Sequence, residues 1–259
     1  MSQNGAMPSL PRVLVIVPTY DEIESLPTIV TRIRAAVPDA DVMVMDDASP
    51  DGTGELADRM AAADPQLSVQ HRPGKGGLGP AYVDGFSRGI AAGYDVLIQI
   101  DADGPHPPER LPEMIKTLWA DAGIGLVIGS RWVAGGSVVD WPMRRELLSR
   151  AANVYANAAL EIGIKDMTAG FRVYRASSVA RLELSSLQSK GYCFQIDMTR
   201  RIRDSGVRIV ELPIEFRDRA AGTSKMSGGI VVEAMKMVTL WGIRRRVRLL
   251  RRRRAVSEP

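Results

Sequence analysis

The sequence contains few of the residue types that mark secreted, thiol-dependent or membrane-spanning proteins. It holds one cysteine, Cys193, which excludes an internal disulfide and indicates a reducing compartment. No charged and then apolar leader opens the chain, and no apolar run reaches the roughly 18 residues of a membrane-spanning helix. The only histidines are His71 and His106, and neither is an obvious general base. We therefore expect a cytoplasmic protein, unless another interaction recruits it to a surface.

The remaining composition is that of a soluble globular protein, with 45% hydrophobic and 25% charged residues among 259. A chain of this length can bury a sizeable core, as one large domain or one domain with an appendage. The net charge of +4 is unevenly placed, because eight arginines and no acidic residue lie between Arg244 and Arg254. The body of the chain is therefore mildly acidic, and the basicity belongs to a tail.

Apolar runs alternate with helical patterns along the chain. Short apolar runs predict strands at Val13–Val17, Val42–Met45, Leu67–Gln70, Val96–Ile100, 125–129 and 207–216. Apolar residues at helical spacing predict helices at Leu26–Val37 with Ser25 as its cap, from Thr53 to about Ala63, at 81–92 and 143–160, and from Tyr192 onward. This alternation predicts an α/β fold with a mostly parallel, doubly wound sheet.

The same patterns divide the chain into four segments. We expect a flexible arm at 1–11, one α/β domain at 12–226, an amphipathic helix at 227–243 and a basic tail at 244–259.

Three of the predicted strands end in polar clusters, Pro18–Glu22, Asp46–Asp47 and Asp101–Asp103. In a parallel sheet these clusters lie along one edge, where ligands of open α/β sheets bind. Asp101 and Asp103, two residues apart beyond a strand end, can aim hard oxygen ligands at one Mg²⁺ or Mn²⁺ ion and leave positions for phosphate oxygens. The alternative is ordinary turn chemistry, since Asp, Ser, Pro and Gly favour turns.

The glycine-rich loop from His71 to Pro80 is not predicted to be a triphosphate-binding loop. It lacks the Gly-Lys-Ser/Thr ending that places a hydroxyl on the metal, and it follows the third strand instead of the first. A flexible loop that packs near a nucleotide fits the sequence better.

Nine short motifs carry a family resemblance. The first four, in order, are Pro18-Thr-Tyr-Asp-Glu22, Asp46-Asp-x-Ser-x-Asp-Gly-Thr53, Gly76-Gly-Leu-Gly79 and Asp101-Ala-Asp103-x-x-His-Pro-Pro-Glu109. The later ones are Gly129-Ser-Arg131, Arg145-x-x-x-Ser149, Asp166-x-Thr-x-Gly-Phe-Arg172, Gly191-Tyr-x-Phe-Gln195 and Gly222-x-Ser-Lys225. The ordered set resembles the family-2 glycosyltransferases, and within them the dolichol-phosphate (polyprenol-phosphate) mannose synthases, over roughly residues 12–240.

The resemblance implies a GT-A fold, GDP-mannose as the donor and a polyprenyl (dolichyl-type) monophosphate as the acceptor. By position, Asp101 and Asp103 would bind the metal. The nucleotide sugar would be held by Pro18, Tyr20, Glu22, Asp47 and the Ala102 backbone. The acceptor phosphate would be received by Arg131, Arg145 and Ser149. The catalytic set would be Asp103 and Arg131 with Arg219 and Lys225, the last two lying against the phosphates from a mobile loop.

Two positions depart from the family pattern. Pro105 stands where the family often has Gln or Ser able to complete the metal shell, so a carbonyl, a water or a glutamate elsewhere must substitute. Asp21 stands where the family usually has Asn. The choice between Mg²⁺ and Mn²⁺ therefore stays open.

The reaction implied by the resemblance poses two electrostatic problems. Charge builds on the leaving diphosphate, which a divalent ion neutralises. Two anionic substrates must also meet, and arginine binds phosphate bidentately without ever losing its charge. Because the acceptor phosphate is already an anion, no strong general base is required. We expect catalysis by positioning and charge stabilisation, with in-line inversion by family analogy.

Alternatives stay open for several residues. Arg145 and Ser149 share a helix face, but they could be a solvated arginine and an incidental serine. Asp166, Thr168 and Arg172 could be structural supports of the site. The donor could be another nucleotide sugar such as UDP-glucose, or the chain could be a non-catalytic nucleotide-sugar binding module. The segment 217–226 is expected to form a lid over the phosphates.

The basic tail has three interpretations, namely docking on an anionic membrane, nucleic-acid binding and a disordered solubilising tail. Arginines near an anionic bilayer each contribute about 1 kcal/mol of binding. The aromatic residues of a base-stacking platform are missing around the cluster, so we expect no nucleic-acid partner. With a lipid-phosphate substrate, we expect peripheral association with the cytoplasmic face of the membrane, with a membrane-embedded partner protein as a further expectation.

Overall fold

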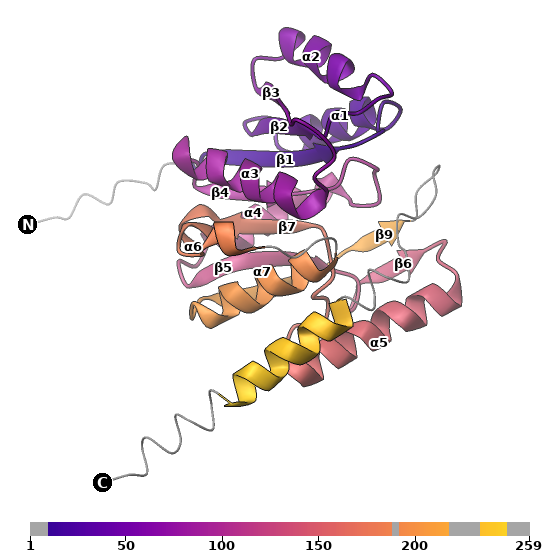
Figure 1. Cartoon of the computed structure of the whole chain (residues 1–259). Coiled ribbons are helices and arrows are strands. Elements are labelled where there is room, and N and C mark those ends of the chain that lie inside the picture. The colour runs from indigo at the N-terminus through magenta and orange to yellow at the C-terminus, as the bar shows by residue number, and fades with distance from the viewer. Residues whose placement is uncertain (1–9, 188–191, 218–233, 248–259) are drawn as a thin grey trace, which may run out of the picture.

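The computed structural model describes residues 10–187, 192–217 and 234–247 (Figure 1). Its centre is a seven-stranded sheet in the order β3-β2-β1-β4-β7-β5-β8. These strands are β1 (Val13–Thr19), β2 (Asp41–Asp46), β3 (Leu67–His71), β4 (Val96–Gln99), β5 (Ile124–Ser130), β7 (Arg172–Arg175) and β8 (Arg208–Pro213). All neighbours pair in parallel except β7, which runs antiparallel to both β4 and β5. The mostly parallel sheet expected from the sequence is confirmed.

Helices cover both faces of the sheet because its central strands are apolar on both sides. In β1, Leu14 and Ile16 face one core, and Val15 and Val17 face the other. The first core is covered by α3 (Leu78–Ala91), α5 (Met143–Leu160), α6 (Ala176–Ala180), α7 (Tyr192–Asp204) and the helix at 234–247. The second core is covered by α1 (Leu26–Ala36), α2 (Thr53–Ala63) and α4 (Leu111–Trp119), preceded by the short turn η1 (Pro108–Arg110).

The predicted boundaries need small corrections. The sequence predicted that β1 stops at Pro18, but the strand continues through it. Proline has no backbone N–H to donate, and none is needed here because β4 pairs with β1 only as far as Ile16. Helix α3 begins three residues before the predicted Ala81. Ser25 is the N-cap residue of α1, but its hydroxyl makes no capping bond and donates instead to Glu22.

The strand predicted over 207–216 is two strands in two sheets. β8 ends at Pro213, and β9 (Glu215–Arg217) pairs in parallel with β6 (Ser137–Val139) in a separate two-stranded sheet. At the break, the Ile214 amide donates to the Ser130 carbonyl at 3.0 Å, and the Ile214 carbonyl accepts from the Ser137 amide at 3.0 Å. The chain therefore crosses from the large sheet to the small one at Ile214.

The C-terminal helix lies beside α5 and runs in the same direction (Figure 1). Val238 and Trp241 are buried, as the predicted amphipathic spacing requires. Gly242 allows the close approach, because a Cβ there would lie 2.7 Å from the Ala159 carbonyl oxygen. The helix continues to 247 beyond the predicted end at 243, since arginine is a good helix former and Arg245 reaches Asp204 at 3.4 Å. Residues 227–233 and 248–259 lie outside the described residues.

A fully buried arginine holds the turn that leads into β7. The Arg172 guanidinium donates to the carbonyls of Met167 and Ala169, both at 2.7 Å, and to the Gln195 carbonyl and the Thr199 hydroxyl on α7, both at 3.0 Å. The turn and α7 are thereby fixed to each other. This confirms a structural role for Arg172.

We predict that Arg172→Met lowers the free energy of unfolding by about 3 kcal/mol, because several buried acceptors lose their donor. Urea denaturation followed by circular dichroism measures the change. The matched control is Arg203→Met on the exposed side of α7, expected to change stability by less than about 0.5 kcal/mol. Equal losses in the two variants would show that Arg172 does not hold this turn.

Candidate functional site

The polar segments after β1, β2, β4 and β5 lie at one edge of the sheet. β1, β2 and β4 pair in parallel, and β5 points the same way because β7 is antiparallel to both β4 and β5. The reversed direction of β7 brings the turn before Arg172 to the same edge. The three carboxylate clusters predicted from the sequence therefore share an edge, and Arg131 joins them.

The first carboxylate of the second cluster is used within the fold. Asp46 is buried and accepts bonds from the Thr19 hydroxyl at 3.1 Å and from the Ser49 hydroxyl at 2.6 Å. Farther along the loop, burial of Asp51 opposes its ionisation, yet hydrogen bonds from Thr53 and from the Ile23 amide outweigh this and lower its pKa. These bonds fix the loops after β1 and β2 to each other.

Asp47 holds the glycine-rich loop over the sheet edge. Its carboxylate accepts from the Gly76 amide at 3.0 Å and the Gly77 amide at 2.8 Å, and it forms an ion pair with Arg72. Lys75 of the same loop lies 3.7 Å above the ring centroid of Tyr20. The loop thus packs against Tyr20 and Asp47, two residues of the predicted nucleoside site.

The other predicted nucleotide residues lie at the ends of β1 and β4. Glu22 accepts from the Ser25 hydroxyl at 2.8 Å, and its amide donates to Thr53 at 3.0 Å. Pro18 is inside β1, and Ala102 is buried between the two predicted metal ligands. Sequence reasoning missed Arg72 and Lys75; their signal was two cations in the glycine-rich loop that follows an acidic strand end.

Asp101 is held by two aromatic side chains at the end of β4. The Tyr82 hydroxyl donates to Asp101 Oδ1 at 3.1 Å, and His106 Nε2 lies 3.4 Å from Oδ2. Burial, and then the charge of Asp101, raise the pKa of Tyr82 well above its usual value, so its hydroxyl keeps the proton that it donates. Gly170 leaves room for this contact, since a Cβ there would lie 3.0 Å from Asp101 Oδ2 and 3.3 Å from His106 Nε2.

This donor set fits a divalent cation that a substrate completes. Asp101 and Asp103 offer hard carboxylate oxygens, and no group of three acidic, histidine or cysteine ligands occurs among the described residues. Mg²⁺-type sites with one or two carboxylates take their other ligands from water and substrate phosphates. Pro105 is the residue that departs from the family pattern. Its carbonyl accepts a hydrogen bond from the Arg217 amide at 3.3 Å, which joins β9 to this turn.

His106 is a site residue that sequence reasoning missed. It is buried, its ring stacks on Phe171 at 5.5 Å between centroids, and it meets the edge of Phe216 at 5.2 Å. Its Nδ1 has no hydrogen-bond partner within the part of the chain that the structure describes. His106 therefore orients Asp101 and packs against β9. The spacing of the motif gave no sign of this contact.

Arg131 is buried in an ion pair at the end of β5. Its Nε and Nη2 donate to the two carboxylate oxygens of Asp166 at 2.7 and 2.6 Å, and Nη2 also donates to Thr168 at 2.9 Å. Trp132, Trp141 and Phe216 surround the guanidinium, with ring centroids 5.2 to 5.5 Å away. Asp166 and Thr168 therefore support Arg131, which agrees with the structural interpretation of this motif.

Helix α5 brings Arg145 to the same aromatic cluster and links it to the Arg131 support. The Arg145 guanidinium lies 4.1 Å from the Trp141 ring centroid. One helical turn beyond Ser149, Asn153 donates to Thr168 at 3.1 Å and accepts the Met167 amide at 2.8 Å. Sequence reasoning missed Asn153, whose only signal was its place four residues after Ser149 on the face that carries Arg145.

A cavity of about 290 Å³ opens beside the two arginines, and we call it the arginine pocket. Its other lining residues are mostly apolar and come from α5, α7 and the C-terminal helix, among them Leu148, Ala152, Tyr155, Ile196, Met235 and Val238. Arg131, Arg145 and Ser149, the three predicted acceptor-phosphate residues, all line it. Arg219, Lys225 and the predicted lid beyond Arg217 lie outside the described residues.

The family described as "Glycosyl transferase family 2" matches residues 14–182. An undecaprenyl-phosphate mannosyltransferase of Micrococcus luteus is 53% identical over 243 residues, covering 93% of this chain and 98% of the relative. A polyprenol monophosphomannose synthase of Mycolicibacterium smegmatis is 52% identical over 237 residues, covering 91% and 89%.

Solved structures with the same fold are more distant in sequence. Glucosyl-3-phosphoglycerate synthase of Mycobacterium tuberculosis, in complex with Mn²⁺, UDP-glucose and phosphoglyceric acid, has a TM-score of 0.66 and 19% identity, covering 90% of this chain and 80% of that one. The mannosyltransferase PcManGT of Pyrobaculum calidifontis, in complex with GDP-mannose and Mn²⁺, has a TM-score of 0.59 and 20% identity, covering 92% and 64%. These two likenesses support the GT-A fold.

We predict that Asp166→Asn lowers the free energy of unfolding by about 3 kcal/mol, because it leaves the buried Arg131 cation without its counter-charge. The double variant Arg131→Met with Asp166→Asn removes that cation too, and we expect it to be more stable than Asp166→Asn alone. Urea denaturation of the wild type, the two single variants and the double variant measures the coupling free energy between Arg131 and Asp166. A double variant less stable than Asp166→Asn would contradict the assignment.

Proposed function

The chain belongs to glycosyl transferase family 2, and on this premise we propose that it transfers mannose from GDP-mannose to a polyprenyl monophosphate, releasing GDP. The observation that carries the proposal is the arginine pocket, an apolar cavity with Arg131 and Arg145 in its wall. A polyprenyl phosphate has the same division between an anionic end and a hydrocarbon chain. The names of the two relatives at 53% and 52% identity support the same acceptor class.

The acceptor phosphate binds at Arg131, Arg145 and Ser149 in this proposal. Asp166 and Thr168 hold the Arg131 guanidinium in one orientation, which is the support that a precise phosphate contact needs. The Trp141 ring centroid lies 5.5 Å from the Arg131 guanidinium and 4.1 Å from that of Arg145, so one aromatic ring attracts both cations. An anion between them relieves their repulsion.

The donor binds at the other loops of the same sheet edge. Pro18, Tyr20, Glu22, Asp47 and the Ala102 backbone hold the nucleotide sugar, and Arg72 and Lys75 bring positive charge to the same loops. Asp101 and Asp103 hold Mg²⁺ or Mn²⁺, which when bound neutralises the diphosphate. Arg219 and Lys225 contact the phosphates from the segment after β9.

The catalytic contribution of the chain is positioning and charge. The acceptor phosphate is already anionic and needs no deprotonation, and His106 is buried against Asp101 rather than placed in the arginine pocket. An acceptor oxygen held by Arg131 attacks the anomeric carbon in line with the departing GDP and inverts it. The rate of transfer therefore depends on how strongly arginine binds the acceptor phosphate and how strongly the cation binds the diphosphate.

The chain meets its lipid substrate through α5 and the C-terminal helix in this proposal. Eight of the ten exposed large hydrophobic residues in the described part of the chain lie on these two helices: Met143, Leu147, Leu148, Val154, Met235, Leu240, Ile243 and Val247. Exposed arginines 144, 150, 244 and 246 flank them. No helix among the described residues is long and apolar enough to cross a bilayer. Peripheral contact with an anionic membrane therefore rests on this face, together with the basic tail.

The transfer itself is tested with labelled GDP-mannose, a short polyprenyl phosphate and Mg²⁺, Mn²⁺ or EDTA, by counting label that enters the organic phase. We expect metal-dependent transfer that Asp103→Ala abolishes. Arg145→Ala should raise KM for the acceptor about tenfold or more, since it removes a charge-assisted phosphate contact. Arg203→Ala, on the exposed side of α7, is the matched control and should leave transfer unchanged.

Other outcomes separate the alternatives. Transfer from UDP-glucose but not from GDP-mannose would keep the fold and the acceptor site and correct the donor. Nucleotide-sugar binding without transfer from any donor would identify a binding module. An Arg145→Ala variant with an unchanged acceptor KM would contradict the placement of the phosphate.

Membrane contact is tested by flotation with vesicles that contain anionic phospholipid. Replacing Leu147 and Val154, which are 60% and 69% exposed, by glutamate should reduce the bound fraction several-fold, because two charges enter the apolar face. Leu10→Glu, at an 86% exposed position away from both helices, is the control. Replacing Arg251–Arg254 by neutral residues measures separately how much the tail contributes to vesicle binding. Undiminished binding in the double glutamate variant would exclude this face.

A further inference from the structure

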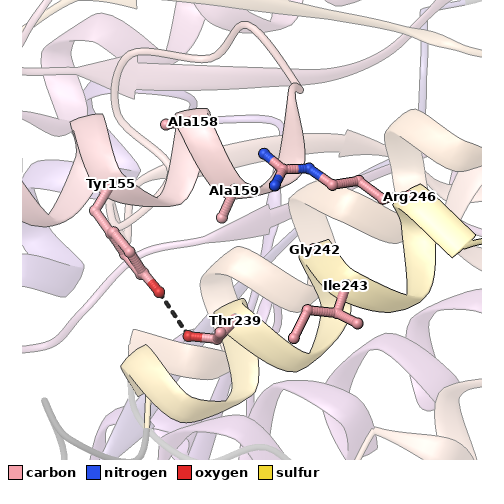
Figure 2. Close-up of a pocket in the computed structure, with 7 residues that line it drawn as sticks. All are labelled: Tyr155, Ala158, Ala159, Thr239, Gly242, Ile243 and Arg246. Atoms are coloured by element: carbon pink, nitrogen blue, oxygen red, sulfur yellow. Dashed lines mark hydrogen bonds between the residues drawn. The ribbon is translucent and has the colours of Figure 1, made fainter.

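A second cavity lies farther along the two helices that wall the arginine pocket, and we call it the distal cavity. Its volume is about 240 Å³, and it is lined by Tyr155, Ala158 and Ala159 of α5 and by Thr239, Gly242, Ile243 and Arg246 of the C-terminal helix (Figure 2). Apart from Arg246 and two hydroxyl groups, its wall is apolar. Nothing in the donor or phosphate chemistry described above uses it.

The distal cavity and the arginine pocket belong to one groove between the same helices. Tyr155 lines both. The arginine pocket is lined by residues from 145 to 156 of α5 and from 234 to 238 of the C-terminal helix. The distal cavity is lined by residues from 155 to 159 and from 239 to 246. From Ser149 to Ala159 the groove follows α5 for about 15 Å. A chain that enters at the arginines therefore reaches the distal cavity by following the helices.

One contact lies where the two cavities meet, at Tyr155, which lines both. The Tyr155 hydroxyl and Thr239 Oγ1 are 2.5 Å apart and join the helices at one end of the distal cavity, while the Arg246 side chain extends toward α5 at the other (Figure 2). Gly242 packs against the Ala159 backbone between them and sets the close spacing of the helices. The Arg246 methylene stem adds apolar surface to this end of the cavity.

We propose that the distal cavity binds the later isoprene units of the polyprenyl acceptor and so sets which acceptor chain lengths are used efficiently. Each cavity alone lies below the roughly 300–1,000 Å³ of ligand pockets, and the two together fall within that range. The phosphate at Arg131 and Arg145 fixes one end of the acceptor, and the apolar groove directs the chain toward Tyr155 and beyond. This inference rests on the proposed function, because it extends the same acceptor site.

The test is a chain-length comparison in detergent micelles, using citronellyl phosphate as the short acceptor and undecaprenyl phosphate as the long one. Ala158→Phe adds a ring at the wall of the distal cavity. We expect KM for undecaprenyl phosphate to rise about tenfold, equal to about 1.4 kcal/mol, with KM for citronellyl phosphate and kcat unchanged. Burial of about two methylene groups accounts for an effect of this size.

Two further variants make the comparison specific. Ile243→Asn places a polar group in the opposite wall and should reproduce the length-selective effect. Ala62→Phe makes the same substitution at an exposed position of α2, outside both cavities and both helices of the groove, and should change neither KM. Equal melting temperatures and equal activity on citronellyl phosphate confirm that the variants are folded.

Several results would overturn the inference. One is a wild-type KM that does not depend on chain length; another is an equal rise in both KM values in Ala158→Phe. A change only in the response to added phospholipid would assign the cavity to a membrane lipid instead. Should the wild type transfer no mannose at all, the proposed function fails. Titration of the tryptophan fluorescence with the two phosphates then still decides whether Ala158→Phe weakens binding of the longer chain alone.

Discussion

The buried ion pair between Arg131 and Asp166 is the interaction on which the site depends. It joins the end of β5 to the turn before β7, and Thr168 and Asn153 connect the same pair to α5. Burying two charges costs several kcal/mol per ion before their attraction is counted, so such a pair is a poor device for stability alone. Its bidentate geometry instead fixes the direction of a guanidinium at the wall of an apolar pocket. That is the requirement for holding a lipid phosphate in one place beside a sugar nucleotide.

The reversed strand β7 makes this arrangement possible. An antiparallel strand in an otherwise parallel sheet delivers the segment before it to the same edge as the ends of β1, β2, β4 and β5. The sheet edge is thereby divided between loops with carboxylates, which suit a nucleotide and a cation, and an end with arginines, which suits a phosphate. Arg172 holds the intervening turn by donating to the backbone carbonyls of Met167 and Ala169. His106 joins the two halves, since it contacts both Asp101 and the Phe216 ring of the Trp141 cluster.

Local pattern predicted much of the fold. The buried strands and the limits of α5 follow from apolar runs and helical spacing, which are properties of neighbouring residues.

The features that the sequence did not predict depend on residues that are distant in the chain. β7 reads Arg-Val-Tyr-Arg, and only the carbonyls of a tertiary turn make its first arginine a buried residue. Asp166 was expected as a support of the site, but its partner Arg131 lies 35 residues away and no local pattern identifies it. His106 and Asn153 take their roles from packing against other elements. The split of the last strand at Ile214 reflects a second sheet that no local pattern shows. The family motifs contain Arg131, Arg145, Ser149 and Thr168, which line the arginine pocket, but they do not contain the apolar residues of its wall.

The most direct test of the acceptor site is to locate the acceptor on the protein. A polyprenyl phosphate that carries a diazirine on the isoprene unit next to the phosphate is photolysed with the protein, and the labelled peptides are identified by mass spectrometry. The account predicts label on α5 between Arg145 and Tyr155, reduced by competing undecaprenyl phosphate and by Arg145→Ala. Label on the glycine-rich loop from His71 to Pro80, or label on α5 that Arg145→Ala leaves unchanged, would contradict it.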